Sequence, residues 1–398
     1  MQNPIQRLVC TFGQRSYGQL PLFGVVATTT TNSTTARKST KSVQPTIMAN
    51  SIRQSSSSVL ATESSNKGMI IINRPKALNA INLEMVRKIY KHLKKCEKSK
   101  SLLIIKGTGE KAFCAGGDIR ALVEAGPTDE SKSFFREEYT TNALIGNYKI
   151  PYIAIIDGIT MGGGVGLSVH GKYRVATDRT LFAMPETAIG LFPDVGGSYF
   201  LPRLQGKLGL YLGLTGYRLR GADAFHAGIA THFCDVNQIP ELETALLNCP
   251  DADDVPELLK KFHSTPEKAF TLEPVLEKIN KNFAADSVEG ILENLQADGS
   301  DWAKKTLETL CKMSPTSMKV TYRQLELGSQ LSLAQCLIME YRLAVRHLER
   351  SDFKEGVRAL LIDKDQQPKW QPSTLADVSE EHVQWFFRKL PDTEELKL

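Results

Sequence analysis

The fold is decided by the stretch Tyr152–Gly166, which in one-letter code is YIAIIDGITMGGGVG. Its first five residues are an apolar run of strand length, which predicts a buried strand over Tyr152–Ile156. The glycine-rich segment Asp157–Gly166 follows and opens a helix that we expect to run to about His170. Glycine lets a backbone come close to a ligand, and the first turn of a helix carries N–H groups without partners. The stretch therefore predicts an α/β protein with a ligand site at the end of a strand.

The same alternation of short apolar strands and helices extends to both sides of this stretch. Strands are predicted over Val59–Ser64, Gly68–Ile72, Leu102–Lys106 and Ala112–Ala115, and helices over Asn82–Cys96 and Thr128–Asn147. From about Gly206 onward helical periodicity dominates, as in Val255–Phe262, Val288–Leu295 and Ala334–Leu348. We therefore expect an α/β core with the active site over residues 58–250, and a mainly helical region packed on it over residues 251–398.

The chain has 398 residues and a formal net charge of +5, which is unevenly distributed. Six basic residues and no acidic residue precede Glu63, which leaves 43 basic and 44 acidic residues in the remainder. Half of the residues from Thr28 to Ser65 are Ser or Thr. Such a segment cannot bury enough apolar surface to fold, and an acid-free, arginine-bearing N-terminus is typical of transit peptides. We expect residues 1–57 to be a disordered mitochondrial targeting segment; a plain tail or a nucleic-acid-binding arm are the alternatives.

Two further segments carry groups suited to catalysis. Phe113–Ile119 (FCAGGDI) ends another predicted strand in glycines, so two glycine-borne N–H groups could point at one oxygen and form an oxyanion hole. Met184–Gly197 (MPETAIGLFPDVGG) places Glu186 and Asp194 in an apolar loop, where carboxyl groups acquire raised pKa values and serve as acids or bases. The alternative is that the glycines form ordinary turns and the carboxylates are solvated.

Several classes of site are disfavoured by the sequence. The seven cysteines form no CxxC motif or Cys/His cluster, and the seven histidines include no HExxH motif, so no metal site is expected. No apolar run reaches the length of a membrane-spanning helix. The basic run Lys88–Lys100 is typical of a solvated helix face, with attraction of phosphates as the alternative.

Four segments in this order resemble the crotonase (enoyl-CoA hydratase/isomerase) superfamily. They are Asn73–Asn79 (NRPKALN), Lys111–Asp118 (KAFCAGGD), Gly162–Gly164, and Pro185–Glu186 with Gly196–Gly197. The resemblance implies a ClpP/crotonase fold, in which stacked ββα units form a superhelical core, with a helical C-terminal region. It also implies a CoA thioester whose carbonyl oxygen accepts hydrogen bonds from the N–H groups of Gly117 and Gly163. The CoA adenine and phosphates are then expected near Asn73–Asn79 and the loop after Gly117.

Two positions depart from the hydratases of this superfamily. Hydratases use two glutamates; the second aligns with Glu186, whereas Gly166 stands at the place of the first. Asp194 stands where hydratases usually have glycine. With Phe134–Tyr139, Lys312–Ser317 and Glu355–Asp365, this combination resembles the branch that hydrolyses 3-hydroxyisobutyryl-CoA in mitochondrial valine breakdown. The resemblance implies substrate contacts at Glu138, Gly163, Glu186 and Asp194.

The reaction implied by the resemblance is hydrolysis of 3-hydroxyisobutyryl-CoA, and of 3-hydroxypropionyl-CoA, to the free acid and CoA in the mitochondrial matrix. Glu186 either attacks the thioester or activates a water. Asp194 positions the hydroxyl or water and assists protonation of the thiolate, and Glu138 receives the 3-hydroxyl. The alternatives are enoyl-CoA hydration or isomerisation, and a non-catalytic subunit of a mitochondrial assembly.

No metal or cofactor is implied by this reaction, because CoA is part of the substrate. The expected partners are an acyl-CoA and, for the N-terminal segment, the mitochondrial import machinery. Nucleic acid and membrane insertion are not expected, and the resemblance is compatible with an oligomer.

Overall fold

The computed structural model describes residues 57–64 and 66–398, which belong to one compact unit, Ser56–Leu398. The predicted targeting segment lies outside the described residues, apart from Ser57 at its end. Within the described ranges, no helix combines the length and the apolar character needed to cross a membrane.

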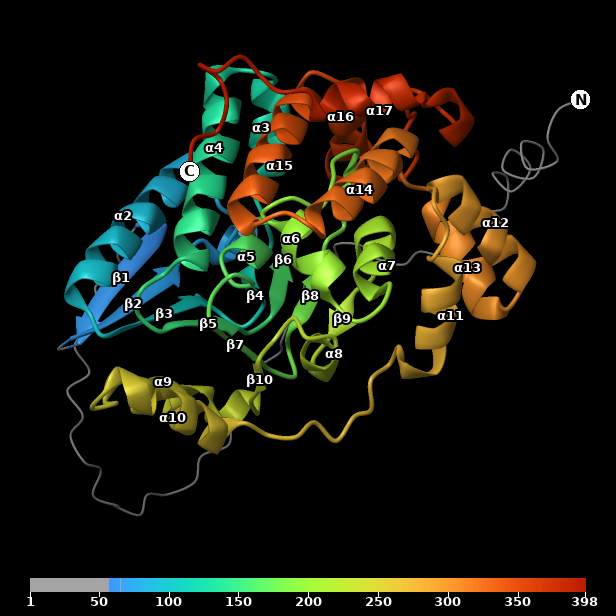
Figure 1. The fold of residues 1–398 in the computed structure, drawn as a ribbon. Coiled ribbons are helices and arrows are strands. Elements are labelled where there is room, and N and C mark those ends of the chain that lie inside the picture. The colour runs from blue at the N-terminus through green and yellow to red at the C-terminus, as the bar shows by residue number, and fades with distance from the viewer. Residues whose placement is uncertain (1–56, 65) are drawn as a thin grey trace, which may run out of the picture. The chain divides into compact units, whose positions relative to one another are not determined.

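The strands of the described part form two sheets (Figure 1). The larger has the order β1 (Val59–Ser64), β2 (Lys67–Ile72), β3 (Leu102–Gly107), β5 (Tyr152–Ile156), β7 (Tyr173–Ala176) and β10 (His232–Phe233). The smaller has the order β4 (Ala112–Cys114), β6 (Ile159–Met161), β8 (Leu181–Ala183) and β9 (Leu219–Arg220). From β3 to β8 successive strands alternate between the two sheets, as expected for stacked ββα units, and this confirms the predicted fold class.

The smaller sheet brings three loops to one edge. β4 pairs with β6 and β6 with β8, and both pairs are parallel, with Thr160 opposite Cys114 and Phe182. The carboxyl ends of parallel neighbours lie at the same edge of a sheet, where ligand sites form. The residues that follow these strands, Gly116–Gly117, Gly162–Gly163 and Glu186, are therefore neighbours.

Helices cover the sheets and make up the C-terminal region (Figure 1). Before β10 they are α2 (Leu83–Ser99), α3 (Ile119–Ala125), α4 (Asp129–Gly146), α5 (Gly163–Gly166), α6 (Gly197–Phe200), α7 (Leu208–Thr215) and α8 (Ala222–His226). After it come α9 (Ile239–Leu247), α10 (Val255–Phe262), α11 (Leu276–Asn282), α12 (Val288–Asp298), α13 (Asp301–Leu310), α14 (Pro315–Gly328), α15 (Leu333–Leu348), α16 (Ser351–Val357) and α17 (Glu380–Phe387). No strand follows β10 in the described residues, and the boundary near residue 250 stays a prediction.

Local signals explain the two long helices that border the site. α2 begins where the Asn82 side chain accepts a hydrogen bond from the Met85 N–H at 3.0 Å, and α4 begins at the corresponding cap Thr128. Both helices match their predicted ranges. β6 to β10 were not predicted, because strands of two to four residues are too short to show periodicity. The helix expected to run to about His170 ends earlier, since α5 stops at Gly166.

The helices form two groups: one packs near the loop after β8, and the other packs against the larger sheet. α4 lies between α2 and the C-terminal helix α15, and α14 and α15 both contact α6 beside the loop after β8. α9 and α10 pack with the larger sheet in a separate small core that includes Ile104, Ile153 and Leu242. The C-terminal helices therefore pack behind the edge of the smaller sheet where the three loops meet.

Candidate active site

The first backbone donor of the site is Gly117, directly after β4. The Ile81 N–H donates to Gly116 O at 2.9 Å and the Asp118 N–H donates to Ile81 O at 2.8 Å, which makes a parallel bridge between Ile81 and Gly117. In such a bridge the N–H of Gly117 points away from Ile81. None of the hydrogen bonds among the described residues uses this N–H, so it is available to a ligand.

The motif Asn73–Asn79 packs beside the loop that bears Gly117 and stabilises it. Asn79 is fully buried; its amide nitrogen donates to Thr108 O at 3.0 Å and to Ala112 O at 2.8 Å, and its oxygen accepts from the Arg74 N–H at 2.9 Å. Arg74 then pairs with Asp118, next to Gly117, at 2.7 Å. The motif therefore holds the loop that bears Gly117 in place.

The second donor is Gly163, the first residue of α5. An N–H in the first turn of a helix has no partner within the helix, and no hydrogen bond of the described residues uses the Gly163 N–H. A β-carbon on Gly163 would lie 3.4 Å from the Gly117 nitrogen, so the two backbone segments lie side by side. The preceding residue, Gly162, has a φ of +45°, which favours glycine. Two neighbouring N–H groups without partners are what an oxyanion hole requires.

Two glutamates flank these glycines. Glu138 on α4 is 3% exposed, and a β-carbon on Gly163 would lie 2.5 Å from its Oε1. Glu186 follows β8 and is 5% exposed, and a β-carbon on Gly162 would lie 3.2 Å from its Oε1. Glu138 Oε1 and Glu186 Oε2 are buried without a hydrogen-bond partner. Buried oxygens of this kind are expected to receive a ligand or a water.

Asp194 completes a cluster of three buried carboxyl groups. It is 5% exposed, and its Oδ2 accepts a hydrogen bond from the Tyr139 hydroxyl at 2.8 Å. Burial raises the pKa of Asp194 to about 7, although the Tyr139 hydrogen bond lowers it. Burial, with a smaller contribution from the charge of Asp194, raises the pKa of Glu138 and of Glu186 well above the ordinary range. Carboxyl groups with raised pKa values can hold a proton and release it, so they can act as acids as well as bases.

The C-terminal helices hold the loop that bears Asp194. Glu340 on α15 accepts hydrogen bonds from the Gly196 N–H at 2.7 Å and from the N–H of Ser198 at 2.9 Å, and also from the Ser198 hydroxyl. Val195 has a φ of +52°, a left-handed conformation that is strained for a β-branched residue. The hydrogen bonds to Glu340 therefore stabilise the backbone conformation of this loop, which positions Asp194.

Gly166 is the position where the hydratases carry their first glutamate. A β-carbon on Gly166 would lie 2.7 Å from Asn142 Nδ2 and 2.7 Å from Val195 Cβ. Real β-carbons do not approach other atoms that closely, so a carboxylate side chain has no room here. Asn142 on α4 and Val195 therefore occupy the space that a glutamate side chain at position 166 would need.

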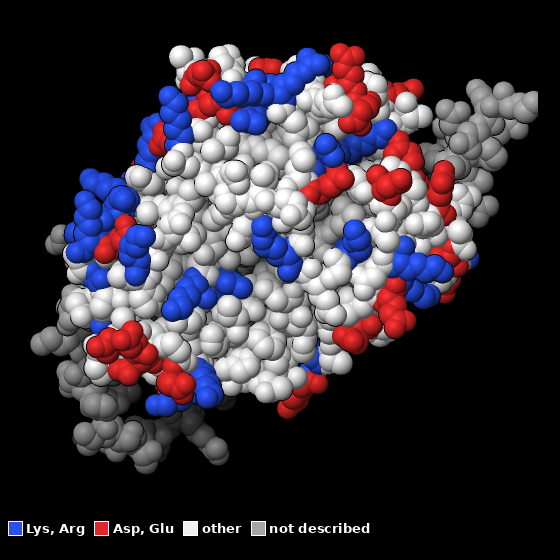
Figure 2. Space-filling view, in the orientation of Figure 1, with Lys and Arg blue, Asp and Glu red and all other residues white. Residues whose placement is uncertain are grey.

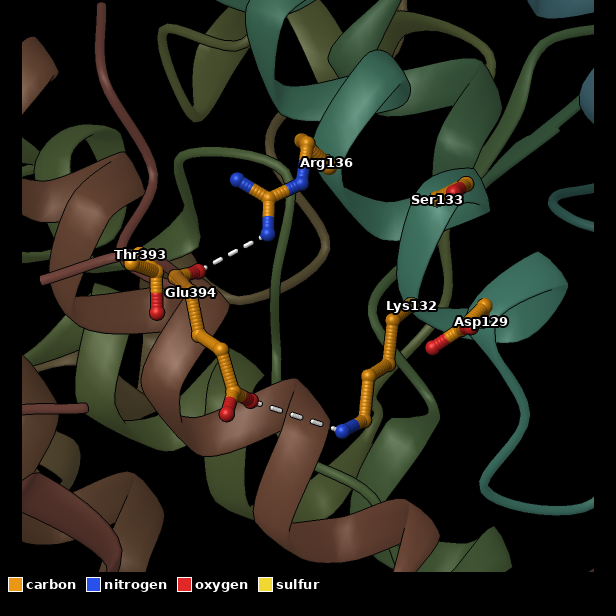
Figure 3. Close-up of a pocket in the computed structure, with 6 residues that line it drawn as sticks. All are labelled: Asp129, Lys132, Ser133, Arg136, Thr393 and Glu394. Carbon is orange, nitrogen blue, oxygen red and sulfur yellow. Dashed lines mark hydrogen bonds and ion pairs between the residues drawn. The ribbon is translucent and has the colours of Figure 1, made fainter. Parts of the chain in front are cut away.

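Other candidate features lie away from this cluster. The pocket in Figure 3 is lined by Asp129, Lys132, Ser133, Arg136, Thr393 and Glu394. Its cations already have partners, since Lys132 pairs with Glu394 at 3.5 Å and Arg136 donates to Glu394 O at 2.8 Å. The basic side chains of α2 gather at the left of Figure 2, and several pair with glutamates, as Lys88 does with Glu84 at 2.6 Å. The described residues contain no His/Cys/Asp/Glu group that could hold a metal ion.

The structure brings all five predicted site residues together: Gly117, Glu138, Gly163, Glu186 and Asp194. Sequence reasoning missed Asn142 and Glu340. Asn142 could have been found, because it lies four residues after Glu138 and so on the same face of α4. Glu340 carries no local signal, because it lies 146 residues beyond Asp194 in an ordinary amphipathic helix.

Comparison with known proteins agrees with this site. A family model described as enoyl-CoA hydratase/isomerase matches residues 67–387. Relatives named "3-hydroxyisobutyryl-CoA hydrolase, mitochondrial" include one from Danio rerio, 57% identical over 352 residues (86% of this chain, 92% of the relative). One from Homo sapiens is 54% identical over 342 residues (83% of this chain, 89% of the relative).

Two solved structures share the fold over nearly their full length. A carnitinyl-CoA dehydratase from Mycobacterium thermoresistibile is 37% identical with a TM-score of 0.80, covering 85% of this chain and 98% of that chain. An enoyl-CoA hydratase from Rhodobacter sphaeroides is 34% identical with a TM-score of 0.78, covering 86% and 100%. The chain belongs to the enoyl-CoA hydratase/isomerase family, in the branch that contains the 3-hydroxyisobutyryl-CoA hydrolases.

Proposed function

We propose that this protein hydrolyses 3-hydroxyisobutyryl-CoA, and also 3-hydroxypropionyl-CoA, to the free hydroxy acid and CoA, a step of valine breakdown. The observation that carries the proposal is the cluster of three buried carboxyl groups beside two unused backbone N–H donors. Carboxyl groups that can act as acid or base, together with N–H donors for an oxyanion, are suited to acyl transfer from a thioester. The choice of acyl group is supported by relatives at 52–57% identity that carry this enzyme's name.

The oxyanion hole supplies the largest single contribution. The thioester carbonyl oxygen accepts hydrogen bonds from Gly117 and Gly163, and negative charge develops on it as the carbon becomes tetrahedral. Both donors are backbone groups fixed by a β-bridge or a helix start, so they need little reorganisation during the reaction. Removal of one such donor typically lowers the rate about 10²–10³-fold.

Glu186 supplies the base in this proposal. It accepts a proton from a water whose oxygen attacks the thioester carbon, and the carbon–sulfur bond then breaks with its electron pair on sulfur. Asp194 in its acid form gives a proton to the departing thiolate, so the products are the carboxylic acid and free CoA thiol. The alternative route is attack by the Glu186 carboxylate itself, which forms a mixed anhydride that water then cleaves. Mass spectrometry of acid-quenched enzyme distinguishes the routes, because only the second leaves an acyl group on Glu186.

Glu138 is assigned to the 3-hydroxyl of the acyl group. Its Oε1 lies against Gly163 and lacks a partner, so it can accept the hydroxyl proton while the carbonyl stays in the oxyanion hole. A thiol-release assay over 3-hydroxyacyl, enoyl and saturated acyl-CoA esters tests this proposal. Faster release from the 3-hydroxyacyl esters is expected, and equal release from all of them would leave only a general thioesterase.

Hydration of an enoyl-CoA is the competing function, since two similar solved structures are named as a hydratase and a dehydratase. The packing at Gly166 argues against it, because the first of the two hydratase glutamates would stand at Gly166 and has no room there. Incubation with crotonyl-CoA should leave the enoyl absorbance unchanged. Rapid loss of that absorbance without thiol release would overturn the hydrolase proposal.

The variant Glu186→Gln tests the base directly. It keeps the size of the side chain but cannot accept the proton, so kcat for thiol release should fall at least about 10²-fold, the low end of what one general base contributes. Glu308→Gln, an exposed glutamate on α13, is the matched control and should keep full activity. Near-normal release by Glu186→Gln would show that the assignment is wrong.

We further infer that the enzyme works in the mitochondrial matrix without a metal or cofactor of its own. The relatives are named mitochondrial, and the acid-free N-terminal segment has the composition that import receptors recognise. A fusion of residues 1–57 to a fluorescent protein should enter mitochondria, and a cytosolic fusion would contradict the inference.

A further inference from the structure

Asn142 is the one asparagine of the catalytic cluster, and its amide is left unsatisfied. The residue is fully buried, and neither Nδ2 nor Oδ1 has a hydrogen-bond partner. Leaving a buried polar group unsatisfied costs about 1–3 kcal/mol, so an orphaned amide needs an explanation. The buried amide of Asn79 makes three hydrogen bonds and shows how a structural asparagine of this protein is placed. The Asn142 amide therefore lacks the hydrogen bonds to the protein that a structural asparagine such as Asn79 makes.

The position of Asn142 is defined by two helices. Glu138 and Asn142 are one turn apart on α4, and Gly163 and Gly166 are one turn apart on α5. Glu138 lies against Gly163, and Asn142 lies against Gly166, since β-carbons there would be 2.5 Å and 2.7 Å from their polar atoms. Asn142 is therefore one helical turn beyond the oxyanion hole, along the same pair of helices.

This order defines a direction for the substrate. Gly117 is partly exposed, whereas Gly163, Gly166 and Asn142 are buried. The large, charged CoA moiety must leave the oxyanion hole on the exposed side, so the short acyl group points inward along α4 and α5. The end of the acyl group then faces polar groups that have no protein partners, Glu138 Oε1 and the Asn142 amide.

We propose that Asn142 binds the 3-hydroxyl of the acyl group together with Glu138, and that it sets the preference for 3-hydroxyacyl over plain acyl esters. The hydroxyl donates its proton to Glu138 Oε1, and its oxygen accepts a hydrogen bond from Asn142 Nδ2. A neutral amide suits this place. A charged side chain at position 142 would add a further charge beside three carboxyl groups that are already crowded together. The inference rests on the proposed hydrolase function and adds a specificity-determining residue to it.

The test compares Asn142→Ala with wild-type enzyme on 3-hydroxyisobutyryl-CoA and isobutyryl-CoA. A site that hydrogen-bonds a substrate hydroxyl discriminates strongly against the analogue without it. We expect kcat/KM for the hydroxylated ester to fall at least about 10-fold, consistent with the loss of one or two hydrogen bonds. The value for isobutyryl-CoA, or its inhibition constant if turnover is too slow, should stay unchanged. Asn147→Ala, at an exposed asparagine that caps the C-terminus of the same helix, is the matched control and should alter neither value.

A stability measurement separates recognition from a structural role. Because the Asn142 amide has no protein partner to lose, Asn142→Ala should keep the unfolding midpoint close to that of the wild type; Asn142→Leu retains bulk if a cavity unfolds the alanine variant. An unchanged ratio of the two kcat/KM values, or an equal loss on both esters, would overturn the inference. Failure of the wild type itself to hydrolyse 3-hydroxyisobutyryl-CoA would instead overturn the proposed function.

Discussion

Adding one methyl group at Gly163 should disable the site through two effects at once. In Gly163→Ala the β-carbon would lie 2.5 Å from Glu138 Oε1 and 3.1 Å from Ile81 Cδ1. Ordinary contact begins near 3.4 Å, so the Glu138 carboxyl must retreat by about 0.9 Å or the start of α5 must shift and carry its N–H with it. Losing one oxyanion donor costs about 10²–10³ in rate, and a displacement of about 1 Å near the reacting atoms costs about 10². We expect kcat/KM for thiol release to fall about 10²–10³-fold.

The control for this change is Gly213→Ala on α7. Its β-carbon would meet the methyl ends of Leu201 and Leu325, both at 3.3 Å, which can adjust, and Pro193 Cγ at an ordinary contact distance of 3.5 Å. Both variants are assayed by thiol release from 3-hydroxyisobutyryl-CoA and checked by far-UV circular dichroism. A folded Gly163→Ala enzyme with more than about a tenth of wild-type activity would refute the oxyanion-hole geometry, since that hole should contribute about 10²-fold or more.

Two further changes test the carboxyl cluster and its support. Because burial raises the pKa of Asp194 from 3.8 to about 7, the folded protein keeps a proton that the unfolded chain releases, so the free energy of unfolding should fall as pH rises from about 4 to about 7. Asp194→Asn should flatten this fall in urea titrations, and an unchanged pH slope would contradict the raised pKa. Glu340→Ala leaves three buried donors without an acceptor, so it should lower the free energy of unfolding by about 2–4 kcal/mol and reduce kcat. Wild-type stability in that variant would show that the Asp194 loop holds its conformation alone.

Much of the core could be predicted from the sequence because its signals are local. Uninterrupted apolar runs such as Tyr152–Ile156 and capping residues such as Asn82 act within a few positions, and the structure follows them. Glycines after strands indicate where a backbone can approach a ligand, whereas the choice of Gly117 and Gly163 among these glycines rests on the family resemblance. Short strands such as β8 were missed because pairing with neighbouring strands, and not their own pattern, makes them strands.

The electrostatic state of the site could be anticipated only in outline. An apolar loop around Glu186 and Asp194 suggests raised pKa values, but their mutual distance and the hydrogen bond from Tyr139 arise from packing of distant segments. The support from Glu340 and the unsatisfied amide of Asn142 likewise depend on which helix faces which loop. Such contacts have no counterpart in the sequence next to the catalytic residues.

The link between Glu340 and the loop of Asp194 has a consequence for truncated forms of the chain. Every residue assigned to the substrate lies before residue 200, yet the carboxylate that sets the Asp194 turn is encoded 146 residues later. A chain that ends before α15 therefore carries its acids and glycines but lacks the carboxylate that accepts hydrogen bonds from the Asp194 loop. A premature stop between codons 200 and 340 should therefore abolish catalysis although every substrate-contacting residue is still present in the chain.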